Sequence, residues 1–410
     1  MGVIDDKYGP APYTYYAGSQ LNRYSFLRDE TEFLTKAYTH PAAQFLVLRQ
    51  LVPPVTPASK PAPDSILPPR PVFHNLKFVN RSEIETILPH QLPTGNDEEG
   101  DNHENRENVG DLLQPYVLFL GLDEQATGAN SMSYKQAHGQ PYFAVEYTTL
   151  PSIVAATTTN TKEIPTNDTP MPKCFADARF DIAPMALRLS AAESAVYAQA
   201  RMYTDWVSRN HHCAACGART RAIAGGTKLR CTRADCKTHG TLTNLVFPRT
   251  DVSVIAAVLN PEGNQLLLGR GRNWPQTFYS CLAGFLEPGE SIEDCVRREV
   301  WEEAGLDFGS GGRVVVHSTQ PWPYPANIMV GCIAQLPGAS GEQQAIHLGN
   351  DAELADAKWF SFTEVREALA RAAGRGRPAS GATLLLPPPE AIAHILLDAI
   401  VNGPVLKTKL

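Results

Sequence analysis

The chain has 410 residues, which predicts two or three domains, and it is 43% hydrophobic and 19% charged, so it can bury a core. Its 36 Lys and Arg residues against 43 Asp and Glu residues give a net charge of −7, which argues against a protein that coats nucleic acid or anionic membranes without selectivity. No apolar run approaches the ~18 residues that span a bilayer, so no membrane insertion is expected.

The two ends of the chain differ in their targeting signals. The N-terminal sequence MGVIDDKYGPAPYTYY lacks the basic and apolar regions of a secretory signal. The C-terminal residues Thr408, Lys409 and Leu410 differ from the peroxisomal address Ser-Lys-Leu by one hydroxyl-for-hydroxyl exchange. We therefore expect a peroxisomal import receptor as a partner and the peroxisome as the location, with the cytoplasm as the alternative.

The N-terminal part of the chain predicts a β-rich domain with inserts. Residues 15–52 have the composition of folded structure, and strands are expected at 116–122 and 141–147. Residues 53–71 are rich in proline and predict a stiff connector or surface loop. Residues 95–108 are strongly acidic and contain no apolar residue, which predicts a solvated, disordered insert.

Four of the eight cysteines gather directly after a helix predicted over 190–209. Their spacing is Cys213-x2-Cys216, fourteen residues, then Cys231-x4-Cys236. In a long chain without a secretion signal, such clustering indicates a metal site rather than a disulfide framework. Four thiolates suit a structural zinc ion and leave no open position for water, so we expect a small zinc ribbon.

The spacing of the second cysteine pair leaves alternatives. His239 could replace Cys236, and His211 or His212 could compete as ligands. Two disulfides or a redox Cys-x-x-Cys pair are less consistent with the sequence context. The same segment carries six basic residues, which indicate either a solvated hairpin or contact with polyphosphate or RNA. These are Arg219, Arg221, Lys228, Arg230, Arg233 and Lys237.

After Pro248 the pattern changes to strands interleaved with a few helices, which predicts an α/β sandwich of about 150 residues. The expected strands cover 252–259, 265–268, 314–317 and 329–335. The expected helices cover 292–304, 363–373 and 389–401.

The helix predicted over 292–304 carries carboxylates on its apolar side. A capping residue, Ser291, and a glycine stop, Gly305, bound this helix. Glu299 and Glu303 fall on its apolar stripe, with Glu302 at the edge, whereas Arg298 and Trp301 are expected on the opposite side. Inward carboxylates repel one another and lose hydration, unless a cation joins them. The pattern therefore predicts a site for a divalent cation such as Mg²⁺ and metal-assisted hydrolysis of a pyrophosphate.

The segment from Gly284 to Leu306 has the full spacing G-x5-E-x7-R-E-U-x-E-E-x-G-U and resembles the Nudix box. Nudix hydrolases cut nucleoside diphosphates linked to another moiety. The resemblance implies that Glu299, Glu302 and Glu303 bind Mg²⁺ or Mn²⁺ and activate water, with Glu303 the first choice for positioning or deprotonating it. It also implies that Glu290 assists and that Arg298 orients the glutamates by ion pairing.

Two further segments narrow the resemblance. The first is Thr319-Gln-Pro-Trp-Pro-Tyr-Pro-Ala-Asn327, and the second is Leu386-Pro-Pro-Pro-Glu-Ala-Ile-Ala-His394. With the cysteine module before the box, they resemble the NADH pyrophosphatases of the NudC type, and the C-terminal tripeptide suits a fungal peroxisomal member. Thr319, Tyr324 and Asn327 depart from the family's Ser, Phe and Ser, so the contacts to the nicotinamide half are less well defined.

This resemblance implies further site residues. Phe285 would stack on adenine together with Phe247 of the partner subunit in a homodimer, and Glu353 would add a carboxylate to the metal cluster. The pocket for the nicotinamide mononucleotide half would be lined by Gln320, Trp322 and Tyr324. The last two could equally be packing residues.

The expected fold class is α+β or α/β, with an N-terminal mixed β-rich Nudix-like domain (1–185), a connecting helix (186–210), a zinc ribbon (211–247) and a C-terminal Nudix α/β/α sandwich (248–410). We expect metal-dependent hydrolysis of NADH, and less readily of NAD⁺, to reduced nicotinamide mononucleotide and AMP. Removal of NAD caps from RNA by the same chemistry is the first alternative, and ADP-ribose and diadenosine polyphosphates are other possible substrates. A binding module on an inactive Nudix scaffold is a third hypothesis, but the intact glutamates of the box argue against it.

Overall fold

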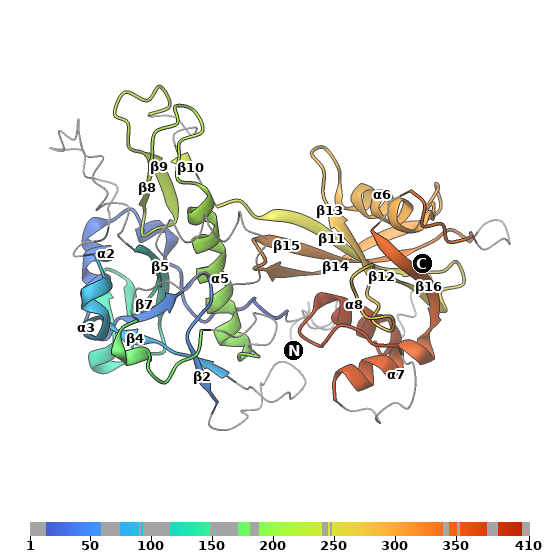
Figure 1. Cartoon of the computed structure of the whole chain (residues 1–410), viewed down its shortest axis with the longest axis horizontal. Coiled ribbons are helices and arrows are strands. Elements are labelled where there is room, and N and C mark those ends of the chain that lie inside the picture. The colour runs from blue at the N-terminus through green and yellow to red at the C-terminus, as the bar shows by residue number, and fades with distance from the viewer. Residues whose placement is uncertain are drawn as a thin grey trace.

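The computed structural model describes residues 14–58, 74–89, 92, 115–147, 171–180, 188–239, 245–246, 248–338, 344–350, 353–374 and 384–403. Three sequence-based predictions fall outside these residues, namely the acidic insert 95–108, the role of Phe247 and the C-terminal tripeptide. Figure 1 shows two lobes, one with the N-terminal elements and the cysteine-rich hairpin, the other with the elements after residue 248. Within the described residues, no helix is both long and apolar enough to cross a membrane.

The N-terminal lobe is built on a mixed sheet with strand order β4-β1-β7-β5, and β6 pairs with β7. β1 runs parallel to β7, whereas β5 runs antiparallel to it. The sheet and its helices comprise α2 (Thr31–Tyr38), β1 (Gln44–Leu48), β4 (Val79–Asn80), α3 (Arg81–Ile84), β5 (Tyr116–Asp123), β6 (Met132–Tyr134), β7 (Ala137–Glu146) and α5 (Ala191–Arg209). The predicted strands at 116–122 and 141–147 are confirmed, although β7 begins earlier.

Both faces of this sheet are buried because β1 is apolar at almost every position. Phe45 and Phe143 stack at 5.2 Å on the face that α2 covers. Leu46 and Leu118 on the other face pack against α5. The Ser190 hydroxyl accepts a hydrogen bond from the Glu193 amide and caps α5 at the start of the helix predicted over 190–209.

The connector or surface loop predicted over 53–71 was wrong at its start, where β2 (Val55–Pro57) pairs with β3 (His74–Leu76). Residues 59–71 lie outside the described part of the chain. Val55 is fully buried, and this burial stabilises a short strand within a proline-rich segment.

The cysteine-rich hairpin contains β8 (Thr220–Ile223), β9 (Lys228–Cys231) and β10 (Leu245–Val246) in the order β10-β9-β8. Its turn docks on the edge strand β5, where the Phe119 amide donates to the Gly225 carbonyl at 2.8 Å. Gly226 has a φ of +88°, and a Cβ there would lie 2.5 Å from the Val117 carbonyl oxygen. Glycine is therefore required at this contact between the hairpin and the N-terminal sheet.

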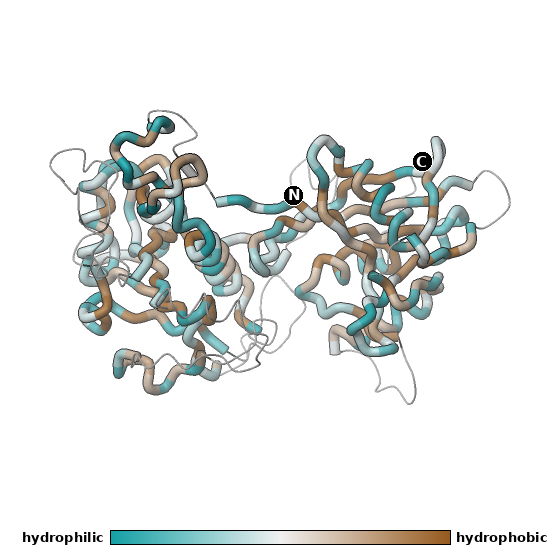
Figure 2. The backbone as a smooth tube through the Cα atoms, turned by 45° about the horizontal axis from the view of Figure 1, so that its top comes forward, coloured by the Kyte–Doolittle hydropathy of each residue, from teal (hydrophilic) through white to brown (hydrophobic). Residues whose placement is uncertain are grey.

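The C-terminal lobe has a mixed sheet with strand order β14-β15-β11-β12-β16, and β13 also pairs with β11. α6 packs on one face, and α7 and α8 pack on the other. The strands are β11 (Asp251–Leu259), β12 (Gln265–Gly271), β13 (Leu282–Phe285), β14 (Arg313–Trp322), β15 (Asn327–Gln335) and β16 (Leu354–Ser361), and the helices are α6 (Ile292–Ala304), α7 (Phe362–Ala372) and α8 (Ile392–Val401). Figure 2 shows hydrophobic backbone segments running through the interior of this lobe.

The sequence analysis missed β13 and β16 and made β14 too short. β13 is four residues long and contains a glycine, and both missed strands gain their stability from pairing partners far away in sequence. β14 continues through Pro321 because it lies at the edge of the sheet, where a missing N–H breaks no ladder. The predicted helix 389–401 begins later, at Ile392, after three prolines.

Candidate active site

The helix α6 is bounded by the local signals that its sequence contains. Ser291 and Asp294 form a reciprocal capping box, and the Asp294 amide donates to the Ser291 hydroxyl at 3.2 Å. Gly305 ends the helix with a φ of +70°, a conformation that favours glycine. The preceding loop carries Glu290 to the start of the helix.

The carboxylates of α6 lie on or beside its buried side, as predicted. Glu303 is 5% exposed and lies with Val296 and Val300 against the sheet. The Glu299 side chain is 14% exposed, and that of Glu302 is 34% exposed. An acidic surface helix would instead present these groups to water, so their burial calls for a compensating positive charge.

The position of Arg298 corrects one sequence-based prediction. The helical wheel placed it on the side away from the glutamates, but its long side chain turns back to them. Its guanidinium lies 2.6 Å from Glu290, 2.9 Å from Glu299 and 2.9 Å from Glu302. Hydrogen bonds from Arg298 lower the pKa of Glu290 to about 2. The ion pairing that the resemblance implied is therefore present in the structure.

Glu299 lies at the centre of this charge cluster. Burial raises its pKa, and the negative charges of Glu302 and Glu353 raise it further. Glu353 itself is exposed at the start of β16. The structure thus brings Glu353 close enough for its charge to affect the pKa of Glu299, although the two residues are 54 apart in the sequence.

These carboxylates have the chemistry to hold Mg²⁺ or Mn²⁺. Glu299, Glu302, Glu303 and Glu353 offer the oxygen ligands that hard cations prefer. Burial is the largest cause of the raised pKa of Glu299, and the charges of Glu302 and Glu353 add to it; a bound cation would offset both effects. The chemistry of these side chains suits a divalent ion, whereas the group of ligand atoms that lies within 4.8 Å of one another among the described residues is that of the cysteine cluster.

Phe285 lies at the end of β13 with its ring 55% exposed. Cross-strand register aligns it with Ser253, Met329 and then Gln320 in one row across the sheet. Three strand spacings of about 4.8 Å place Gln320 roughly 14 Å from Phe285 along this row. An aromatic platform and the Gln320 segment therefore lie on a common line at one end of the sheet.

The segment from Thr319 to Asn327 forms the tip of the hairpin that joins β14 and β15. Gln320 is fully buried, and its amide nitrogen donates to the carbonyls of Tyr15 at 3.1 Å and Glu390 at 2.8 Å. Trp322 and Tyr324 are partly buried against Tyr16. The structure thus places these three side chains in contact with other parts of the chain, and their predicted roles in a substrate pocket stay predictions.

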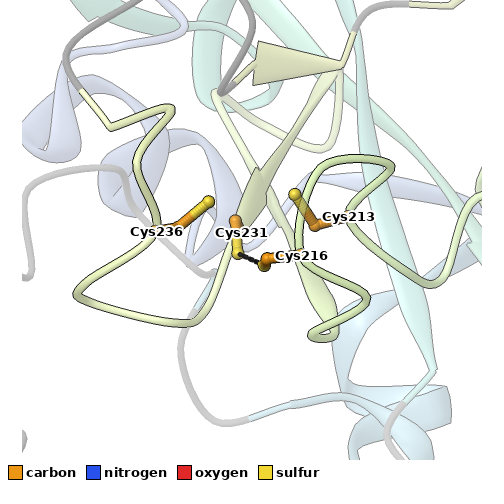
Figure 3. Close-up of side chains that lie close together, drawn as sticks. All are labelled: Cys213, Cys216, Cys231 and Cys236. Carbon is orange, nitrogen blue, oxygen red and sulfur yellow. Dashed lines mark hydrogen bonds between the residues drawn. The ribbon is translucent and has the colours of Figure 1, made fainter.

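The four clustered cysteines converge as the spacing predicts (Figure 3). Their sulfur atoms all lie within 4.8 Å of one another, and those of Cys216 and Cys231 are 3.5 Å apart. A tetrahedral zinc site with Zn–S bonds of about 2.3 Å has sulfur–sulfur edges of about 3.8 Å. Hydrogen bonds from Thr238 lower the pKa of Cys236 to about 7, which favours a thiolate. The His239 ring instead contacts the Arg233 carbonyl at 2.7 Å.

The NUDIX domain family model matches residues 249–379. The chain is 32% identical over 395 residues to an NAD-capped RNA hydrolase of Schizosaccharomyces pombe, a match that covers 95% of this chain and 93% of that protein. It is 29% identical to the NAD-capped RNA hydrolase of Saccharomyces cerevisiae over 95% of this chain and 96% of that one. A human NAD-capped RNA hydrolase is 39% identical over 52% of this chain and 43% of its own length.

The chain belongs to the NudC-type Nudix hydrolases. It is therefore an enzyme, and the binding module on an inactive scaffold is not supported. The Nudix hydrolase fold expected from the box is confirmed in the C-terminal lobe.

Two contacts to the β14–β15 hairpin tip were missed in the sequence analysis. Arg201 on α5 donates to the Pro323 carbonyl at 2.8 Å, and the Tyr16 and Tyr324 hydroxyls are 3.1 Å apart. Both residues lie in the N-terminal lobe, more than 100 residues before their partners. The local signal was the pair of adjacent tyrosines, Tyr15 and Tyr16, at the start of the segment 15–52 that was expected to fold.

Gly284, the first residue of the Nudix box, provides a test of the glutamate geometry. A Cβ at this position would lie 1.9 Å from the carboxyl carbon of Glu299. We expect Gly284→Ala to displace that carboxylate and to lower kcat by about 10- to 100-fold, since an ångström of misplacement is costly at a reaction centre. Gly338→Ala is the control, because its added Cβ meets nothing closer than 3.9 Å. Equal kcat values for both variants would contradict this role of Gly284.

The lowered pKa of Glu290 leads us to expect that the stability of this Nudix hydrolase depends on pH. Its folded pKa of about 2 lies below the ordinary value of 4.5, so its stabilising effect is present above about pH 4.5 and is lost as the pH falls toward 2. With an allowance for solvent screening, we expect Glu290→Gln to lower the free energy of unfolding by about 1–2 kcal/mol at pH 7. Urea unfolding without added divalent cation should show this difference shrinking below pH 4.5. A difference that does not vary with pH would refute the assignment.

Proposed function

We propose that this enzyme hydrolyses the pyrophosphate bond of NADH and NAD⁺, giving AMP and the reduced or oxidised nicotinamide mononucleotide. The observation that carries the proposal is the set of carboxylates on α6, held by Arg298, which also donates to the carbonyl of the exposed Phe285. The names of the curated relatives, which are hydrolases of NAD-capped RNA, point to the same dinucleotide.

The residues have distinct tasks in this reaction. Glu299, Glu302, Glu303 and Glu353 would hold Mg²⁺ or Mn²⁺, which would supply positive charge against the pyrophosphate and make water more acidic. Glu303, the most deeply buried glutamate of the helix, would position the attacking water and accept its proton. Arg298 holds Glu299 and Glu302 in place through charge-assisted hydrogen bonds. Phe285 offers its exposed face to adenine, since aromatic rings stack readily on bases.

Removal of NAD caps from RNA is the second candidate function, by the same chemistry at the same site. Two observations favour it, the names of the relatives and the basic residues of the cysteine-rich hairpin. Arg219, Arg233 and Lys237 are exposed on that hairpin. Exposed cations of this kind attract phosphate backbones in a salt-dependent manner.

We further propose that the cysteine cluster holds structural zinc, that the enzyme forms a homodimer and that Thr408-Lys409-Leu410 directs it to peroxisomes. The convergence of the four sulfur atoms supports the zinc proposal. The other two rest on the sequence resemblance. Light scattering tests the dimer. A fluorescent protein that carries residues 404–410 at its C-terminus, compared with one that lacks the last three residues, tests whether the tripeptide directs import into peroxisomes.

A product analysis over a panel of substrates decides between the candidate functions. The purified enzyme is given NADH, NAD⁺, NAD-capped RNA, ADP-ribose and diadenosine tetraphosphate, each with Mg²⁺ or Mn²⁺. NADH hydrolysis with the highest kcat/KM supports the first function. Preference for capped RNA, lost when Arg219, Arg233 and Lys237 are neutralised, supports the second, and preference for ADP-ribose contradicts both.

A further inference from the structure

The loop of residues 344–350 is hydrogen-bonded to the end of α6. The His347 amide donates to the Ala304 carbonyl at 2.9 Å, and the Asn350 side-chain amide donates to the Trp301 carbonyl at 3.0 Å. The last four carbonyls of a helix have no partner within the helix, so bonds from a neighbouring loop satisfy them and fix their position. The loop 344–350 therefore holds the last turn of α6 at its first and its last residue.

This loop also packs closely against the helix end. Ile346 and Leu348 are partly buried against the core beneath α6. A Cβ added at Gly305 would lie 2.8 Å from the Cβ of His347, so the loop can approach this closely only because residue 305 is a glycine. Apolar burial and two hydrogen bonds thus fix the loop 344–350 against the last turn of α6.

The turn held in this way carries Glu302 and Glu303, and the loop leads directly to Glu353. Glu353 follows Asn350 by three residues, so the two Cα atoms are at most about 11 Å apart. On the other side of Glu353, β16 begins at Leu354, which is paired with β12. The hydrogen bond of Asn350 therefore ties the start of β16 to the helical turn that carries two of the catalytic glutamates.

The position of Glu353 relative to α6 matters because one cation can join these carboxylates only if their oxygens converge. Oxygen ligands of Mg²⁺ lie about 2.0–2.1 Å from the ion. Among the described residues, no three carboxylates have oxygens within 4.8 Å of one another. Binding of an ion must draw the carboxylates together, and the movement that Glu353 has to make depends on where its chain is held.

We propose that Asn350 is a positioning residue for the divalent cation, because its bond to the Trp301 carbonyl keeps Glu353 within reach of an ion on the α6 glutamates. The inference rests on the proposed metal-dependent function and goes beyond it, since Asn350 would touch neither the ion nor the substrate. Loss of the bond should weaken cation binding and leave the turnover of the fully loaded enzyme nearly unchanged.

The test replaces Asn350 by leucine, which has a similar size but donates no hydrogen bond. Isothermal titration of Mn²⁺ into the free enzyme should show a Kd about fivefold higher than that of wild type, the effect of about one hydrogen bond. The Mn²⁺ concentration for half-maximal NADH hydrolysis should rise by the same factor, whereas kcat at saturating Mn²⁺ should stay within about twofold. Asn350→Gln, which can still donate to a carbonyl, should recover part of the affinity.

A double-mutant cycle tests the route through Glu353. Glu353→Gln should itself raise the Kd of Mn²⁺, and adding Asn350→Leu to this variant should raise the Kd no further, because the group that Asn350 positions is already lost. If Asn350→Leu does not fold, Asn350→Ala takes its place in both arms with the same expected values.

Gln335→Leu is the matched control. The Gln335 side-chain amide also donates one hydrogen bond to a backbone carbonyl of this lobe, that of Pro261, at 3.1 Å. Its loss should lower the melting temperature in EDTA about as much as Asn350→Leu does, but the Kd of Mn²⁺ should equal that of wild type.

An unchanged Kd of Mn²⁺ in folded Asn350→Leu overturns the positioning role. A fivefold effect that persists in the Glu353→Gln background, or that Gln335→Leu reproduces, overturns it as well. Because these titrations contain no substrate, a wild-type enzyme that binds Mn²⁺ but cleaves neither NADH nor NAD⁺ refutes the proposed function alone. A wild-type enzyme that binds neither Mn²⁺ nor Mg²⁺ refutes both.

Discussion

Glu303→Gln is expected to lower kcat on NADH by about 10³- to 10⁴-fold, the range that a general base contributes in combination with metal ligation. The amide keeps the size of the side chain but can neither accept a proton nor hold a cation through a second anionic oxygen. Because Glu303 is 5% exposed, replacing its charge removes a desolvation cost, so the variant should remain folded. Steady-state kinetics and a melting curve together separate loss of chemistry from loss of fold.

The matched control is Glu293→Gln, on the exposed side of the same helix, which should retain wild-type kcat. Isothermal titration with Mn²⁺ adds a readout that is independent of turnover, and Glu303→Gln should bind the ion more weakly than the control does. Full turnover in Glu303→Gln would remove the assigned base. Undiminished Mn²⁺ binding would show that Glu303 does not contribute to the metal centre.

Cys231→Ser should abolish zinc binding and destabilise the cysteine-rich hairpin. Structural zinc contributes on the order of 10 kcal/mol or more to small metal-dependent folds, and a serine hydroxyl is a poor replacement for a thiolate. Cys231 is buried at the end of β9, and among the described residues the ligand group contains the four cysteines and no fifth candidate. Zinc content per chain, measured by elemental analysis, should fall from about one to near zero.

Cys174→Ser is the control for this experiment, since Cys174 lies outside the cluster and is only partly buried. It should keep its zinc and its melting temperature. A wild-type protein purified without zinc, yet fully folded, would contradict the proposal. A Cys231→Ser variant that retains one zinc ion would shift the ligand set toward His211, His212 or His239.

Local signals carried the successful part of the sequence analysis. The boundaries of α6 and α5 were predictable because capping residues act within one helical turn, at Ser291 and Ser190. The glutamates of α6 were placed on the correct side for the same reason, since helical periodicity is local. Arg298 was misplaced because the helical wheel gives the direction of a Cβ and ignores the reach of a long side chain.

Non-local contacts account for what was missed. β16 pairs with β12, which lies far earlier in the sequence, and its own sequence alternates weakly. The hydrogen bond between Tyr16 and Tyr324 joins residues that are 308 apart in the sequence. Composition and periodicity carry no information over such a separation. Gln320 was expected at a pocket wall, yet its amide is used by the backbone of Tyr15, Glu390 and Ile392. Such uses follow from the assembled fold alone.

The docking of Gly225 and Gly226 against β5 has a consequence for biosynthesis. β5 is the edge strand of the N-terminal sheet, and its free side is closed by the hairpin turn. A cell short of zinc would then produce chains whose N-terminal sheet has an open edge, the kind of surface that seeds aggregation. Metal supply during synthesis would thereby influence the yield of soluble enzyme through the N-terminal lobe, which does not hold the catalytic glutamates.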